Sequence, residues 1–351
     1  MACRERIVIP LQIPSKLQDL MYAFRESKVL FAACDMGVFD ILQDSDAPQS
    51  VEDISSKMGS NVDATECLMN TLVAVELLEK KKQDGSWLYS NSVIARQFLT
   101  KSSPDSLIDY IKHSNKVIYP LFSNLENAIR EGSNQWMRTF GHSKEDVWKD
   151  EYSTEGSCLQ FLRIAEEFWL RLYICFVLFV FLVRNKGGPG TMAYTLCQYY
   201  PNMKITVCDL QSVVDSARHF RPSLKDCPNQ GNISYVVGNF FQEDLPKAEL
   251  YILSRILHDW SDEKADLILS NVYECLPSGG RVLIAERFLD EDKIGPKSTL
   301  LTSLNMLVQV DGKERTRDEY RKLLEKQGFV DIQAKQLDSS EGSDAILCRK
   351  A

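Results

Sequence analysis

YILSRILHDW, at residues 251–260, is an apolar run that ends abruptly in polar residues. Similar runs recur from residue 176 onward, and helical patterns lie between most of them. Strands that alternate with helices predict a doubly wound α/β sheet, whose strands are apolar on both sides because helices cover both faces. We expect strands at Val177–Val183, Ile205–Asp209, Ile233–Val237, Leu250–Leu253, Val282–Ala285 and Ala345–Cys348.

The first third of the chain has a different pattern. Asp19–Leu42 carries apolar residues at helical spacing, and Ser50 and Gly59 are a typical helix start and stop. After a second expected helix, the pair Asp84-Gly85 is a strong hairpin signal between two strand-like runs. Helix, helix and hairpin is the outline of a winged helix.

These patterns predict two domains, a mainly helical winged-helix-like domain at residues 1–115 and an α/β domain at residues 116–351. The second begins with helices, broken near Gly132 and Gly141, before the first strand. The first domain carries more apolar residues than a small winged helix needs, among them Leu30, Phe31 and Phe39. We therefore expect it to form a homodimer.

Composition limits the possible partners. The formal net charge is −8, which disfavours a nucleic-acid backbone as the main partner. Lys80, Lys81 and Lys82 lie on the expected wing and leave a DNA-binding alternative open, but lysines also protect an exposed strand edge. We expect no nucleic-acid partner.

Membrane insertion and disulfide bonding are also disfavoured. The longest apolar run, Leu172–Val183, is shorter than the roughly 20 residues that a membrane-spanning helix needs. The ten cysteines include no CxxC pair, and the amino terminus has no signal-peptide pattern. We expect a cytoplasmic protein with reduced cysteines and no membrane partner.

Ligands of a doubly wound sheet bind at the carboxyl ends of its strands. A glycine-rich turn, Gly187–Gly190, follows the first expected strand, and Asp209 ends the second at a position suited to ribose hydroxyls. The third strand ends in Gly238–Phe241, a small residue, an amide and two aromatics that could frame an adenine ring. The fourth leads to His258.

Together these motifs resemble the small-molecule O-methyltransferases that use S-adenosylmethionine. The resemblance rests on Asp209, GNFF (238–241), LHDW (257–260), LPSGGRVLIAE (276–286), SLNMLVQ (303–309) and GKERT (312–316). It implies a winged-helix dimerisation domain, a Rossmann-like methyltransferase domain, and a small phenolic acceptor of the indole type.

The resemblance also implies roles for individual residues. His258 is the expected general base, flanked by Glu286 and Glu314. The expected acceptor pocket is lined by Asp259, Asn305 and Gln309. The expected contacts to S-adenosylmethionine are Tyr152, Trp169, Gly188, Asp209, Gly238, Asn239, Phe240 and Arg255.

The expected chemistry suits these residue types. A phenol has a pKa of about 10, and a neutral imidazole with a pKa near 6.5 can take its proton as the methyl group transfers. A neighbouring carboxylate fixes the imidazole tautomer and stabilises the imidazolium. No metal is expected, because the reactive methyl group belongs to the cofactor.

One stretch departs from the family pattern. Arg184 stands where the family has an acidic residue that helps to hold the ammonium group of the cofactor, and Lys186 stands where it has a glycine. Two alternatives therefore remain open beside the enzyme: a protein of this fold that binds cofactor poorly and acts through its dimer surface, and an O-methyltransferase for another phenol.

We predict that this chain binds S-adenosylmethionine more weakly than the double variant Arg184→Asp, Lys186→Gly. Two cations repel the ammonium and sulfonium groups, at a cost on the order of a few kcal/mol in a partly shielded cleft. Calorimetric titration of both proteins measures the difference, and equal affinities would show that the altered loop is tolerated.

Overall fold

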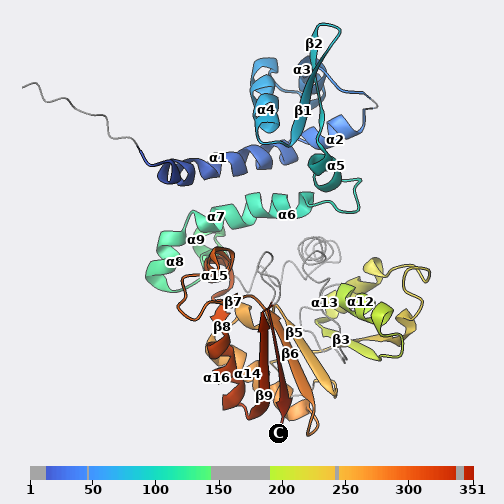
Figure 1. Ribbon diagram of the computed structural model, residues 1–351, viewed down its shortest axis with the longest axis vertical. Helices are drawn as coiled ribbons and strands as arrows, with labels where there is room; N and C mark the ends of the chain where they lie inside the picture. The colour runs from blue at the N-terminus through green and yellow to red at the C-terminus, as the bar shows by residue number, and fades with distance from the viewer. Residues whose placement is uncertain (1–12, 46, 144–189, 242–244, 337–343) are drawn as a thin grey trace, which may run out of the picture. The chain divides into compact units, whose positions relative to one another are not determined.

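The computed structural model describes residues 13–45, 47–143, 190–241, 245–336 and 344–351 (Figure 1). Its contacts divide the chain into two compact units, Met1–Asn115 and Lys116–Ala351. The expected strand Val177–Val183 and the three residues Tyr152, Trp169 and Gly188 lie outside the described residues.

The first unit is mainly helical and contains one antiparallel hairpin. Its elements are α1 (Ser15–Asp35), α2 (Val38–Gln43), α3 (Val51–Met58), α4 (Val62–Ala74), β1 (Leu78–Gln83), β2 (Ser86–Asn91), α5 (Val93–Phe98) and α6 (Ile108–His113). The predicted sequence of helices followed by a hairpin is confirmed.

Local signals of the sequence explain where these elements begin and end. The Ser50 side chain accepts a hydrogen bond from the backbone N–H of Asp53 and so caps α3, which ends at Gly59 in the left-handed conformation. In the hairpin turn both Asp84 and Gly85 have positive φ, 48° and 89°, as a tight two-residue turn requires.

Three apolar residues from which we expected a dimer surface lie in or against the core of the first unit instead. Phe39 is 1% exposed and belongs to this core, against which Leu30 and Phe31 pack. The exposed apolar side chains of α1 lie at other positions: Leu17, Leu20, Met21, Tyr22 and Phe24.

The lysines of the wing have partners within the first unit. Lys80 donates to Asn70 and lies 5.0 Å from the centre of the Tyr89 ring, and Lys81 pairs with Glu79 at 2.8 Å. These contacts favour the structural interpretation of the lysines over a nucleic-acid groove.

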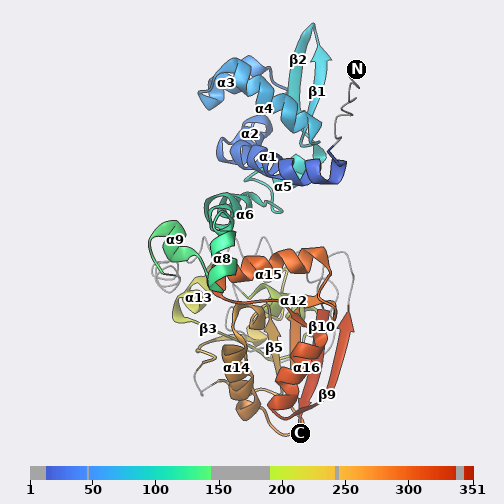
Figure 2. The same cartoon turned by 90° about the vertical axis from the view of Figure 1, so that its left-hand side faces the viewer.

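The second unit combines helices with parallel and antiparallel strands (Figure 2). After the π-helical turn Ser114–Ile118, its longer helices are α7 (Tyr119–Phe122), α8 (Leu125–Glu131), α9 (Trp136–Phe140), α12 (Thr191–Tyr199), α13 (Gln211–Ser216), α14 (Asp262–Cys275), α15 (Lys297–Val310) and α16 (Arg317–Lys326). Its strands are β3 (Ile205–Asp209), β4 (Ile233–Val237), β5 (Leu250–Ser254), β6 (Arg281–Glu286), β7 (Phe288–Leu289), β8 (Arg315–Thr316), β9 (Phe329–Gln336) and β10 (Asp344–Lys350). The expected strands do not include β7, β8 or β9.

Among the described strands, the order β5-β6-β10-β9 forms one sheet, and β3 pairs with β4 in parallel. β5 and β6 are parallel, whereas β10 is antiparallel to both of its neighbours. Figure 1 shows α14 and α16 beside this sheet, and α12 and α13 beside β3.

Both faces of the sheet are covered, as a doubly wound fold requires. Along β5, Tyr251 and Leu253 belong to a core shared with α14 and α16, whereas Leu250 and Ile252 belong to a second core shared with α12 and β3. Side chains alternate across a strand, so a continuous apolar run fills both cores. The predicted Rossmann-like fold is confirmed.

Among the described residues there is neither a helix that could span a membrane nor a disulfide bond. No helix there is both long and apolar enough to cross a bilayer. The cysteines described are free thiols, at positions 34, 67, 197, 208, 227, 275 and 348.

A candidate active site around His258

His258 lies on a short 3-10 turn, Leu257–Asp259, directly after β5, and it is buried. Its Nδ1 is 2.8 Å from Oε1 of Glu314 and 3.7 Å from Oε2 of Glu286. On the other side of the ring, Nε2 is 3.6 Å from Oδ1 of Asp259. The structure thus brings together four residues that the sequence pattern placed at one site.

Strand pairing explains why two distant carboxylates meet here. Glu286 is the last residue of β6, and Glu314 directly precedes β8. Two residues after Glu286 the chain enters β7, in which Phe288 pairs in parallel with Arg315 of β8. This pairing brings residues 286 and 314 to one end of the sheet.

Glu286 is also fixed by the turn that carries the histidine. Its Oε1 accepts hydrogen bonds from the backbone N–H groups of Ile256 (2.9 Å) and Leu257 (3.0 Å). Because Arg255 adopts a positive φ of 54°, the chain bends sharply at the strand end and presents both donors to this oxygen.

The charges around the imidazole raise its pKa. Burial acts to lower the pKa of His258, but the carboxylates of Glu286, Glu314 and Asp259 outweigh it and raise the pKa to about 9. The expected value near 6.5 is therefore wrong, because the sequence could not show that three carboxylates converge on one ring. Burial in turn raises the pKa of Glu286.

This cluster also offers a set of metal ligands, although the sequence leads us to expect no metal. Ligand atoms of His258, Glu286 and Glu314 lie within 4.8 Å of one another. However, Nδ1 already shares a short hydrogen bond with Glu314, and the Arg255 guanidinium lies 3.6 Å from the same carboxylate. With these cationic partners in place, an acid–base role suits the cluster better than a metal site.

Two predicted cofactor residues lie at adjacent strand ends. The backbone carbonyl of Asp209, at the end of β3, accepts from the N–H of Gly238 at 3.0 Å. A Cβ atom at Gly238 would lie 2.4 Å from Sγ of Cys208, so this position requires glycine. The Asp209 carboxylate is buried and accepts from the N–H of Leu210.

The next two residues have structural partners. Oδ1 of Asn239 accepts from the N–H of Phe241, which tightens the turn. The Phe240 ring is 5% exposed and packs edge-on against the rings of Phe241 and Trp260 in the core. The Phe240 side chain therefore supports the turn from within.

The two remaining acceptor-pocket candidates lie on α15, which packs against the turn that carries His258. Oδ1 of Asn305 is buried without a hydrogen-bond partner among the described residues. The backbone carbonyl of Gln309 accepts from the indole N–H of Trp136 at 2.8 Å. That contact anchors α15 to α9.

Sequence analysis missed two neighbours of the site. Gly312 and Arg315 were part of the quoted motif GKERT, yet no role was assigned to them. The burial of a single arginine leaves no periodic pattern in the sequence, so only the motif could have indicated that Arg315 lies at the site. In the structure both residues contact the turn that carries His258.

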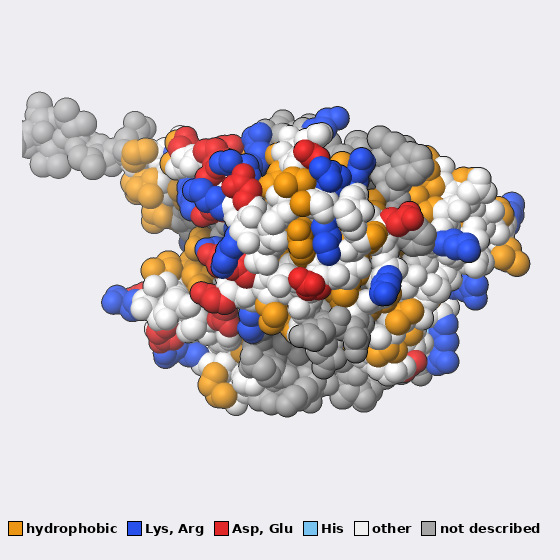
Figure 3. Space-filling view, turned by 90° about the horizontal axis from the view of Figure 1, so that it is seen from below, with side chains coloured by type: hydrophobic (Ala, Val, Ile, Leu, Met, Phe, Trp, Pro, Cys, Tyr) orange, Lys and Arg blue, Asp and Glu red, His pale blue; other side chains and the backbone are white. Residues whose placement is uncertain are grey.

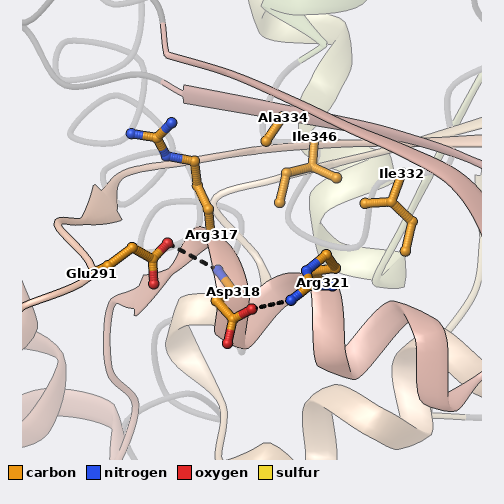
Figure 4. A pocket seen from close by; sticks show the side chains of 7 residues that line it. All are labelled: Glu291, Arg317, Asp318, Arg321, Ile332, Ala334 and Ile346. Atoms are coloured by element: carbon orange, nitrogen blue, oxygen red, sulfur yellow. Dashed lines mark hydrogen bonds and ion pairs between the residues drawn. The ribbon is translucent and has the colours of Figure 1, made fainter.

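A surface pocket of about 390 Å³ lies elsewhere, between α16, β9 and β10. Figure 4 shows that Asp318 pairs with Arg321 and that Glu291 accepts from the N–H of Asp318, whereas the Arg317 guanidinium points away from them. Because none of the predicted site residues lines this pocket, it does not mark the active site.

Comparison with known proteins agrees with this geometry. Residues 122–330 match the O-methyltransferase domain, and residues 18–101 match the O-methyltransferase dimerisation domain. The chain belongs to the O-methyltransferase family. The matched regions include His258, most of the second unit and the greater part of the first unit.

Individual O-methyltransferases are similar over nearly the whole chain. The acetylserotonin O-methyltransferases of Macaca mulatta and Homo sapiens are 39% and 38% identical, over 95% of this chain and 97% of each relative. The crystal structure of human N-acetylserotonin methyltransferase in complex with SAM has a TM-score of 0.86 and 36% identity, covering 100% of both chains. A human probable bifunctional dTTP/UTP pyrophosphatase/methyltransferase protein is also 39% identical, over 99% of this chain but 55% of its own length.

We predict that Glu314→Gln lowers the pKa of His258 from about 9 toward 6.5, because an amide cannot stabilise the imidazolium by charge. A raised folded-state pKa adds stability that is complete below about pH 6.5 and is lost as the pH rises through about 9. The variant should therefore lose less stability than the wild type across this interval.

Nitrogen NMR of the imidazoles and denaturant unfolding at several pH values measure both effects. Glu325→Gln, which removes the same charge on the exposed face of α16, is the control. An unchanged His258 titration in Glu314→Gln would contradict the assignment.

Proposed function

We propose that this protein transfers the methyl group of S-adenosylmethionine to the hydroxyl of N-acetylserotonin and so produces melatonin. The observation that carries the proposal is the imidazole of His258 held against two buried carboxylates at the end of a doubly wound sheet. The acetylserotonin O-methyltransferases similar to this chain along nearly their whole length support the choice of acceptor.

The described residues fit the proposed cofactor. A buried carboxylate at the end of β3 suits ribose hydroxyls, and at the adjacent strand end Gly238 packs so closely against Cys208 that no side chain fits there. Oε2 of Glu286 and Oε2 of Glu314 accept no hydrogen bond from the described residues, and their negative charge suits a cationic ligand. We assign Asp209, Gly238 and Arg255 to this cofactor.

When bound, S-adenosylmethionine supplies an electrophilic methyl group on a sulfonium that leaves as a neutral thioether. We assign to His258 the removal of the phenolic proton at Nε2 as the O–CH₃ bond forms and the S–CH₃ bond breaks. Glu314 accepts from Nδ1–H, fixes the tautomer and stabilises the resulting imidazolium, with Glu286 adding a second negative charge.

Because the carboxylates raise the pKa of His258, they favour the imidazolium that this proton transfer produces. The same carboxylates also keep the imidazole mostly protonated at neutral pH before the acceptor binds. A cationic ligand nearby opposes this charge and returns His258 toward the neutral form, since like charges lower the pKa of an imidazole.

The acceptor specificity rests on α15. Oδ1 of Asn305 can accept from an N–H or O–H of the acceptor, which would satisfy a buried oxygen that otherwise costs free energy. Assay of methyl transfer to N-acetylserotonin beside other small phenols tests this choice. Faster transfer to another phenol would favour the alternative that the acceptor differs.

We also propose a homodimer, formed through the first unit, that works in the cytoplasm. The match of residues 18–101 to a dimerisation domain supports the first statement, and the free cysteines are consistent with the second. Figure 3 shows acidic and basic side chains mixed on the left of the face that it views, and separate, mostly basic side chains toward its right edge.

We predict that His258→Ala lowers kcat with N-acetylserotonin by about 10²–10⁴-fold, the usual contribution of a general base. His219→Ala, at an exposed position of the same unit, should change kcat less than twofold, which corresponds to about 0.4 kcal/mol of activation free energy. Retention of more than about a tenth of the activity in His258→Ala would remove His258 from this role.

We predict that the double variant Leu20→Asp, Phe24→Asp weakens the dimer. Both side chains are exposed apolar residues of α1, at 59% and 50%, and burying two carboxylates in an apolar interface is unfavourable. Light scattering measures the mass across a dilution series. Leu224→Asp, at an exposed apolar position of the second unit, is the control; a dimer of unchanged stability in the double variant would place the interface elsewhere.

A further inference from the structure

We propose that Arg315 is a positioning residue that holds the turn carrying His258 in the geometry needed for proton removal. The inference rests on the proposed function, because it assigns Arg315 a part in the same reaction. Arg315 is 0% exposed, although arginine is rarely buried completely, and its side chain reaches the turn from the neighbouring strand β8.

The guanidinium of Arg315 binds the backbone on both sides of His258. One Nη donates to the carbonyl of Leu257 and the other to the carbonyl of Trp260, each at 2.7 Å. Its Nε donates to Oδ1 of Asp262 at 2.9 Å, at the first turn of α14. The planar, rigid fork of an arginine can make these three contacts together, whereas a lysine cannot.

The residues before Arg315 hold the same turn. The N–H of Lys313 donates to the carbonyl of His258 itself at 2.9 Å. A Cβ atom at Gly312 would lie 2.1 Å from that carbonyl oxygen, so only glycine allows the two backbones to approach this closely. The carbonyls of Leu257, His258 and Trp260 are therefore all bound by the segment 313–315.

The same segment also carries the acidic partner of the base. Glu314 stands between Lys313 and Arg315, and its carboxylate is 2.8 Å from Nδ1 of His258. Because the backbone contacts on either side fix where the two segments meet, they also fix this distance. A shift of about 1 Å at a catalytic group can cost about 10²-fold in rate, so the clamp bears on turnover and not only on stability.

Arg315 also has contacts that a purely structural residue would have, namely the Asp262 ion pair and the Tyr320 ring, 5.8 Å away. The experiment therefore compares Arg315→Ala and Arg315→Lys with Arg349→Ala. Arg349 is a matched control, because its Nε pairs with Asp331 at 2.8 Å and its Nη1 donates to the Lys350 carbonyl at 3.2 Å, at the far end of β10.

The first measurement is the protonation of His258, which does not depend on turnover. The chain has four histidines, so the spectrum of His258→Ala identifies the signal of His258 in imidazole nitrogen NMR. In Arg315→Ala and Arg315→Lys the His258 titration should shift toward lower pH by at least about one unit, a tenfold change in the protonation equilibrium. Arg349→Ala should leave it unchanged.

The second measurement is steady-state turnover, well below the melting temperature of each variant. Arg315→Ala should lower kcat by about 10²-fold with little change in the KM for S-adenosylmethionine, and added guanidinium should restore part of the loss. Arg315→Lys should be intermediate. Arg349→Ala controls for general loss of stability.

Wild-type titration and turnover in a folded Arg315→Lys would overturn the inference, even if Arg315→Ala fails to fold. A loss of kcat that follows only the unfolded fraction, with the His258 titration unchanged, would equally reduce Arg315 to a structural role. If the wild type itself transfers no methyl group, the proposed function fails, while the NMR comparison still decides whether Arg315 positions His258.

Discussion

The ion cluster of His258 with Glu286 and Glu314 is the interaction on which the rest of the site depends. Two carboxylates buried beside one imidazole are unfavourable unless each charge finds a partner. The backbone N–H groups of Ile256 and Leu257 and the Arg255 guanidinium provide such partners. The sharp bend after β5, the end of β6 and the start of β8 are all constrained by this requirement.

The sheet supplies the rigidity that such a cluster needs. β5 and β6 are parallel neighbours with apolar side chains on both faces, so their carboxyl ends are held by two cores at once. The functional residues then extend from these ends on short turns. Rigid strands with reactive side chains at their ends are the general arrangement of ligand sites in open α/β folds.

The negative charges around His258 bear both on the binding of a cationic ligand and on proton transfer to the imidazole. The carboxylates favour the imidazolium, and the oxygens of Glu286 and Glu314 that accept no hydrogen bond from the described residues favour a cationic ligand. A phenol can give up its proton only to a neutral imidazole. The same negative charges therefore suit a cationic ligand and also stabilise an imidazolium.

The sequence by itself determined the strands with continuous apolar runs, the capped helix α3, the hairpin turn and the identity of the charged motif residues. These signals are local, since each depends on periodicity or on one residue's backbone preference. Only the tertiary structure decided that residues 258, 286 and 314 meet and that the pKa of His258 is raised. It also decided that Phe39 lies in the core while Leu20 is exposed, and that Arg315 binds the turn that carries His258. Those outcomes depend on strand pairing between distant segments and on the burial that this pairing produces. Neither can be predicted from a local sequence pattern.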